Sequence, residues 1–171
     1  MTDAPNTPDQ NLPGAGNPAS GPSVRVLGQY VKDLSFENPG APDTLRGSAA
    51  QPNIDLGIDV GARSLDAETF EVEIILSAKA ERDGAALFVC ELNYAGLFQV
   101  RGLEETQREA FLLVEAPRLI FPFARQIVAS ATQDGGFPPL MLEPVDFAGL
   151  YRQQLAQRAA GGAAGEPAGN A

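Results

Sequence analysis

The chain has 171 residues, a length that fits one domain, and it carries 22 acidic against 12 basic residues for a formal charge of −10. This charge repels nucleic-acid phosphates and anionic membranes, so a partner attracted by charge should present a basic surface. There is no histidine and only one cysteine, Cys90, which excludes Ser-His-Asp and Cys-His catalysis, histidine-ligated metal sites and an intrachain disulfide.

Both ends of the chain are poor in side chains that could be buried. Residues 1–23 are rich in Pro, Gly, Asn and Ser, and residues 158–171 are mostly Ala and Gly. Because neither stretch can offset its ordering entropy by burial, we expect two disordered tails around one domain at 24–157. We see no secretory signal and no apolar run near the roughly 20 residues of a membrane span, so we expect a soluble, cytoplasmic protein.

Four stretches alternate apolar and polar residues with period two, which predicts β-strands. They cover 24–37, 53–60, 70–80 and 86–100. In the first strand Asp33 and Glu37 project together from the polar face. The Pro- and Gly-rich stretch 38–52 predicts a long crossover loop, and the pair Asp83–Gly84 predicts a tight hairpin. With no helix between the strands, we expect an antiparallel meander.

The stretch 102–136 predicts two helices that meet at Pro117. Acidic residues at its start suit the N-terminus of a first helix over 103–114. Proline has no N–H and disfavours helix in the residue before it, so the second helix restarts at Pro117 and runs to about Thr132. This second helix is apolar nearly all round. It must be covered on more than one side, and we expect a second copy of the chain to supply that cover.

An extended, Pro-bounded segment at 137–144 leads to a last helix, with Asp146 as its cap and apolar residues at helical spacing after it. The fold class is α+β: a four-stranded antiparallel sheet with a long Pro-interrupted helix and a C-terminal helix packed on one side.

Candidate catalytic groups have simpler explanations. Glu104 and Glu105 fit a helix start, while Glu71 and Glu73 fit a solvated strand face. Cys90 lies on an apolar strand face and reads as a buried small hydrophobe. No phosphate loop, metal-ligand cluster or nucleic-acid motif occurs, so we expect no enzyme, cofactor or metal site. Apolar residues, in contrast, exceed what one sheet and a short helix should bury, which indicates a binding surface.

Three stretches resemble the SecB protein-export chaperones of proteobacteria: YVKDLSFENPGAP at 30–42, LFVCELNYAGLFQVRGLEETQ at 87–107 and PRLIFPFARQIVASATQDGGFPPLMLEPVDFAGLY at 117–151. They occur in the family's order, and the similarity covers about 24–157. The resemblance implies a homotetramer, a dimer of dimers whose helices are sandwiched between outward-facing sheets. It also implies an ATP-independent holdase that keeps unfolded secretory precursors in hydrophobic grooves and delivers them to the SecA translocation ATPase.

The resemblance also assigns roles to individual positions. The positions that match SecA contacts are Asp33, Glu37, Val89 and Glu91. Those that match inter-protomer packing sites are Cys90, Leu92 and Tyr94, to which the all-round apolar helix adds Leu119, Phe123 and Ile127. The expected precursor-binding groove comprises Ile54, Leu56, Ile58, Leu140, Leu142, Phe147 and Leu150. One departure from the family is Ala50, where the crossover loop would carry an aromatic side chain.

Two alternatives stay open. A sheet packed on a long helix also occurs in acyl-thioester enzymes, so the chain could be a carrier or enzyme for apolar small molecules, although it has no histidine. A chaperone of the same fold could instead serve a toxin–antitoxin system. The acidic positions on the predicted strands favour protein export.

Overall fold

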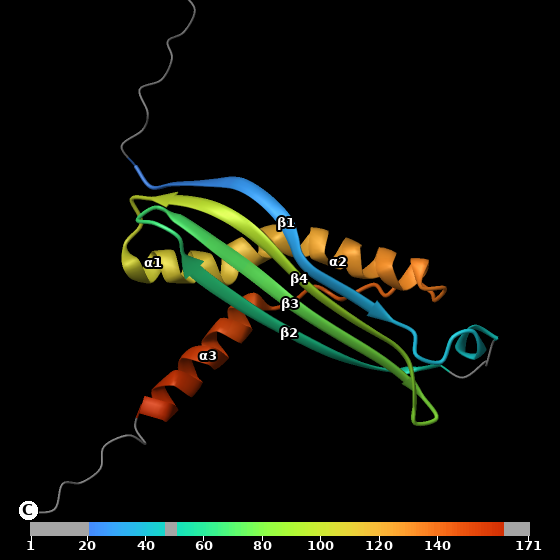
Figure 1. Ribbon diagram of the computed structural model, residues 1–171. Coiled ribbons are helices and arrows are strands. Elements are labelled where there is room, and N and C mark those ends of the chain that lie inside the picture. Colours follow the sequence, from blue (N-terminus) through green and yellow to red (C-terminus); the bar gives the residue numbers. More distant parts are fainter. Residues whose placement is uncertain (1–20, 47–50, 163–171) are drawn as a thin grey trace, which may run out of the picture.

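The computed structural model describes residues 21–46 and 51–162. Four long strands form one antiparallel sheet: β1 (Ser23–Glu37), β2 (Asn53–Ser64), β3 (Thr69–Arg82) and β4 (Ala85–Arg101). The strand order is β1-β4-β3-β2, so β1 lies beside β4 at the edge opposite β2 (Figure 1). The expected meander is therefore correct for β2, β3 and β4 and wrong for β1. The connection after β1 is far too long for a hairpin, so nothing local holds β1 beside β2.

The hairpin between β3 and β4 forms at the predicted place. Asp83 and Gly84 have φ angles of 52° and 78°. Two successive positive φ values match a two-residue type I′ turn, which glycine and aspartate tolerate better than most residues. This turn holds the register in which β3 and β4 present their apolar residues, including Ile74 and Leu92, to one face of the sheet.

Strand β1 does not alternate as simply as its sequence predicts. Its pairing with β4 shifts once after Val26 and again after Val31. Each bulge adds one residue and turns the following side chains to the opposite face. Tyr30, expected on the apolar inner face, therefore lies on the outward face, where its hydroxyl donates to a carboxylate of β3. The two shifts cancel, so Asp33 and Glu37 keep the outward orientation that the sequence predicts.

The helical segment after the sheet is continuous where the sequence predicts a break. It comprises α1 (Glu105–Ala110), the π-helical turn η2 (Phe111–Glu115) and α2 (Ala116–Asp134). The π-turn changes the hydrogen-bond register just before Pro117, which has no N–H to donate. The sequence predicts that the helix is interrupted at Pro117. In the structure the helix instead changes from π-helical to α-helical hydrogen bonding there, without a break. A second proline, Pro122, lies within α2 on its exposed side.

Helix α2 crosses the inner face of the sheet (Figure 1). Its Ile120 packs directly over Gly96 on β4. A Cβ atom at this position would lie 2.9 Å from Cγ2 of Ile120 and 2.7 Å from the ring of Phe98. The missing side chain therefore allows the close approach of helix and strand. Ala124 and Val128, further along the same side of α2, are fully buried, so the core lies between α2 and the β3–β4 pair.

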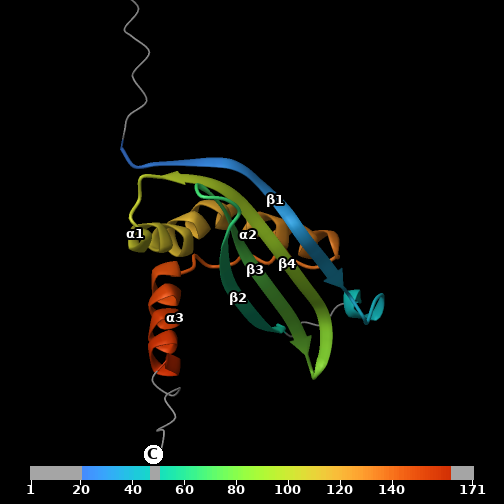
Figure 2. The same ribbon diagram turned by 60° about the vertical axis from the view of Figure 1, so that its left-hand side comes forward.

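Helix α3 (Phe147–Gly162) starts in the core and then leaves it. Gly149 N–H donates to Oδ1 of Asp146 over 3.0 Å, which confirms the predicted cap. The rings of Phe147 and Phe121 meet edge to face with centroids 5.7 Å apart. Beyond this first turn, α3 projects away from the sheet (Figures 1 and 2). None of the described helices is long and apolar enough to cross a membrane.

Candidate functional site

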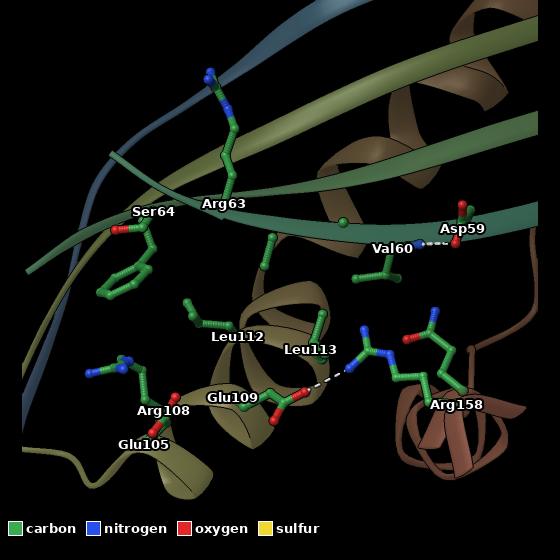
Figure 3. Close-up of a pocket in the computed structure, with 14 residues that line it drawn as sticks. Asp59, Val60, Arg63, Ser64, Glu105, Arg108, Glu109, Leu112, Leu113 and Arg158 are labelled. Carbon is green, nitrogen blue, oxygen red and sulfur yellow. Dashed lines mark hydrogen bonds and ion pairs between the residues drawn. The ribbon is translucent and has the colours of Figure 1, made fainter. Parts of the chain in front are cut away.

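Two adjoining hollows lie between β2, the α1–η2 segment and α3. The larger has a volume of about 580 Å³, and its lining includes Phe70, Arg108 and Leu113 (Figure 3). The smaller, of about 170 Å³, is lined among others by Ile58, Leu113 and Leu150. Because Leu113 and Val60 line both, the two hollows form one groove, here called the α3 groove.

A third hollow lies at the other end of the sheet, where η1 (Asp43–Leu45) forms part of its lining. It has a volume of about 490 Å³ and is here called the loop hollow. Its apolar lining comprises Leu45, Ile54, Leu87, Phe88, Phe137 and Leu140. The rings of Phe88 and Phe137 pack with centroids 5.0 Å apart and form an aromatic side of this hollow. Ala50, which stands where the resemblance to the family implies an aromatic side chain, lies outside the described residues.

The inner face of β2 joins the loop hollow to the α3 groove. Ile54, Leu56 and Ile58 pair with Ala80, Ala78 and Leu76 of β3 and project on the same side as the helices. Since α2 covers β3 and β4, it leaves this row open: Ile54 is 41% and Leu56 40% exposed.

Five of the seven expected groove residues border this open apolar surface. Leu140 lines the loop hollow and Leu150 lines the α3 groove, beside the β2 row. Leu142 and Phe147, with exposures of 4% and 1%, are buried in the core of the protomer and line none of the hollows described above. Their side chains pack inward because the extended segment and the first turn of α3 are pinned against α2.

The four residues matched to SecA contacts lie together on the outward face. Glu37 pairs with Val89 and Asp33 with Asn93, and Glu91 lies between these two pairs on β4. Asp33 and Glu91 both line a small hollow of about 190 Å³. Among the described residues, the carboxylates of Asp33, Glu37 and Glu91 take part in no ion pair. Their charges are therefore available to a basic partner.

The sequence predicts Glu71 on a solvated strand face, and that prediction is wrong. Its side chain is only 3% exposed because Tyr30, Lys32 and Arg63 close over it from β1 and β2. Lys32 Nζ lies 3.1 Å from Glu71 Oε2 and 2.8 Å from Glu73 Oε2. The hydrogen bond from Arg63, followed by that from Tyr30, lowers the pKa of Glu71 to about 2.

The residues expected between protomers fall into two groups. Cys90, Leu92 and Tyr94 are buried within the protomer on the inner face of β4. Burial raises the pKa of the Cys90 thiol. Leu119 and Phe123 project from the other side of α2 with 49% and 51% of their surfaces exposed, and Ile127 is half-buried.

Comparison with known proteins decides the family. The family model described as preprotein translocase subunit SecB matches residues 17–158. The chain belongs to the SecB family. The protein-export protein SecB of Maricaulis maris is 61% identical over 170 residues, covering 99% of this chain and 96% of the relative. The protein-export protein SecB of Hyphomonas neptunium is 56% identical over 163 residues, covering 88% of this chain and 95% of the relative.

A solved structure shows the same fold at low identity. The SecB-like chaperone of Mycobacterium tuberculosis, in complex with an antitoxin peptide, superposes with a TM-score of 0.60 at 18% identity, over 71% of this chain and 90% of that one. This likeness supports the architecture alone. The family and its close relatives make the chain a protein-export chaperone, and they do not favour a small-molecule carrier or a toxin–antitoxin chaperone.

Proposed function

We propose that this SecB-family chaperone holds unfolded secretory precursors, without ATP, along the β2 row and in the hollows at its two ends. The observation that carries the proposal is the exposure of Ile54 and Leu56 between the loop hollow, whose lining is mainly apolar, and the α3 groove, where Ile58 and Leu150 adjoin polar side chains. An unfolded precursor exposes similar apolar side chains. Burying them against such a surface is favourable by about 25 cal/mol per Å² and needs no particular sequence.

Aggregation of a chemically denatured precursor, followed by light scattering, tests this groove. Leu56→Asp should lower the suppression of aggregation, because a charge on the β2 row opposes burial of apolar client side chains. Ile75→Asp is the matched control, since Ile75 is equally exposed at 42% but lies on the outward face of β3. Full suppression by a folded Leu56→Asp variant would contradict the groove assignment.

The outward acidic face is proposed to dock the SecA ATPase. Asp33, Glu37 and Glu91 support this role, because they cluster on two neighbouring strands without ion-pair partners among the described residues. A net charge of −10 adds long-range attraction for a basic partner surface. Val89 lies among them and offers an apolar contact.

Double charge reversal tests the docking face. Asp33→Lys with Glu91→Lys should weaken SecA binding by about tenfold or more and make it less sensitive to salt. The control reverses two exposed acids away from this face, Asp134→Lys with Glu143→Lys, at the same net charge. Equal weakening by both pairs would show that only total charge matters and would overturn the site.

The same proposal includes a homotetramer, a dimer of dimers, in the cytoplasm. The exposed Leu119 and Phe123 on the side of α2 away from the sheet support assembly, since large apolar side chains gathered on one helix face favour a second helix or sheet upon them. Fractionation of cells tests the location, and recovery of the protein outside the cytoplasm would contradict it.

A further inference from the structure

The outward face of the sheet carries carboxylates at both of its edges. Two rows of paired residues cross all four strands on this face. From β2 to β1, the first row comprises Asp59, Ile75, Asn93 and Asp33, and the second comprises Asp55, Lys79, Val89 and Glu37. In both rows the carboxylates belong to the outer strands. Asp55 and Asp59 are here called the β2 edge pair, and Asp33 and Glu37 the β1 edge pair.

The β2 edge pair is as free of neighbouring cations as the β1 edge pair. Asp55 and Asp59 are exposed, and within the part of the chain that the structure describes neither forms an ion pair. The basic residue of the two rows, Lys79, is engaged by Glu81, with Nζ 2.6 Å from Oε1. Asp59 Oδ1 accepts the N–H of Val60 over 2.8 Å, which holds this carboxylate at the edge of β2 with its charge unpaired (Figure 3).

Towards α1, the next acids of the outward face are neutralised. Lys32 Nζ lies 2.8 Å from Glu73 Oε2 and 3.1 Å from Glu71 Oε2, and Glu71 also binds Arg63. The unpaired negative charge of this face therefore stops at the row of Asp59. It is confined to the half of the sheet near the loop hollow, but there it spans the full width from β1 to β2.

The strand order sets the distance between the two edge pairs. Neighbouring strands lie about 4.8 Å apart, and three such steps lead from β1 through β4 and β3 to β2, so the pairs are about 14 Å apart. This separation exceeds the screening length of about 8 Å at physiological ionic strength. One basic group cannot serve both pairs, so a partner that uses both must present basic groups at two places about 14 Å apart.

We propose that the β2 edge pair is a second docking point for SecA, which binds a basic group of SecA about 14 Å from the group held by the β1 edge pair. The inference rests on the proposed docking of SecA beside Asp33, Glu37 and Glu91. A single acidic cluster attracts a basic partner but lets it rotate about the contact. Two separate contacts fix the direction in which SecA lies across the four strands.

Calorimetric titration of SecA into the full chain tests the second docking point. Asp55→Lys with Asp59→Lys should weaken SecA binding by about fivefold and reduce its sensitivity to salt, as expected for two solvent-exposed charge contacts. When this pair is combined with Asp33→Lys and Glu91→Lys, the two losses should multiply, because sites this far apart act independently. No client is present, since Asp59 also borders the α3 groove.

The control is Asp134→Lys with Glu143→Lys, which changes the net charge equally but lies away from the outward face. Asp55→Asn with Asp59→Asn should weaken binding by about twofold, and it serves if the double reversal misfolds. If the β2 edge variants bind SecA as tightly as the control while Asp33→Lys with Glu91→Lys binds weakly, the second docking point is overturned and the first stands. If neither edge weakens binding beyond the control, the proposed docking on this face is itself refuted.

Discussion

The side chains of Tyr30 and Glu71 meet over β4, the strand that separates β1 from β3. The hydroxyl of Tyr30 donates a hydrogen bond to Glu71 Oε1. Ala95 lies opposite Tyr30 on β4, and its small side chain leaves room for this contact. With Lys32 from β1 and Arg63 from β2, this one carboxylate of β3 ties β3 to β1 across β4 and to its neighbour β2.

This carboxylate predicts a dependence of stability on pH. The folded-state pKa of Glu71 is about 2, against an ordinary value of 4.5. Its contribution is therefore present above pH 4.5 and is lost as the pH falls from about 4.5 to 2. Glu71→Gln should lower the free energy of unfolding at pH 7 by roughly 2 to 3 kcal/mol and by much less near pH 2 to 3.

Urea denaturation at several pH values measures this difference. Glu68→Gln is the control, because Glu68 forms an exposed ion pair with Arg101 and should contribute less than about 1 kcal/mol. A Glu71→Gln cost that stays constant down to pH 2 would refute the electrostatic explanation.

Gly96→Ala should destabilise the protein by about 1 to 3 kcal/mol, because the new methyl group overlaps Ile120 and forces α2 away from β4. The measurement is the free energy of unfolding in urea. At Gly28 on β1 an added Cβ meets nothing within 4 Å, so Gly28→Ala should have little effect. Equal effects at the two positions would mean that the approach of α2 does not depend on Gly96.

Phe123→Asp should reduce the mass of the particle in solution below that of the proposed tetramer, because a carboxylate on the exposed side of α2 opposes burial against a second protomer. Multi-angle light scattering measures the mass. Leu155→Asp is the control, since Leu155 is an exposed apolar residue on the distal part of α3. A Phe123→Asp variant of unchanged tetrameric mass would exclude this surface from the interface.

Arg158→Ala should increase hydrogen exchange in the distal half of α3 without a measurable change in global stability. The pair with Glu109 tethers this half to α1 at 3.0 Å, but the side chains of Arg158 and Glu109 are 64% and 41% exposed, so the pair is worth at most about 1 kcal/mol. High salt should raise exchange in the wild type towards that of the variant. Identical exchange of the two proteins at low salt would show that the ion pair does not hold α3.

Features that depend on neighbouring residues were predictable. The alternation in β3 and β4, the turn at Asp83–Gly84 and the cap at Asp146 follow from local sterics and hydrogen bonding, and the structure confirms them. The exposed β2 row containing Ile54 and Leu56 was also anticipated, because its apolar residues exceed what the core needs.

Features that join distant segments were missed. The sequence does not show that β1 lies beside β4, so it gave no sign that Tyr30 and Lys32 cover Glu71. The bulges of β1 depend on its pairing with β4, and their positions cannot be read from alternation alone. Leu142 lies in the core and not in the expected groove. The sequence does not decide between the two, because an apolar residue in an extended segment can face either way.

The sequence by itself determined the positions of the four strands and of the last helix, the family, and the apolar and acidic residue sets from which the two candidate surfaces are built. Tertiary structure alone decided which apolar residues fill the core and which stay open, since that depends on where α2 crosses the sheet at Gly96. It also decided that Glu71 is buried. Burial and ion pairing are properties of neighbours in space, and a strand order or a helix crossing brings those neighbours together from distant parts of the chain.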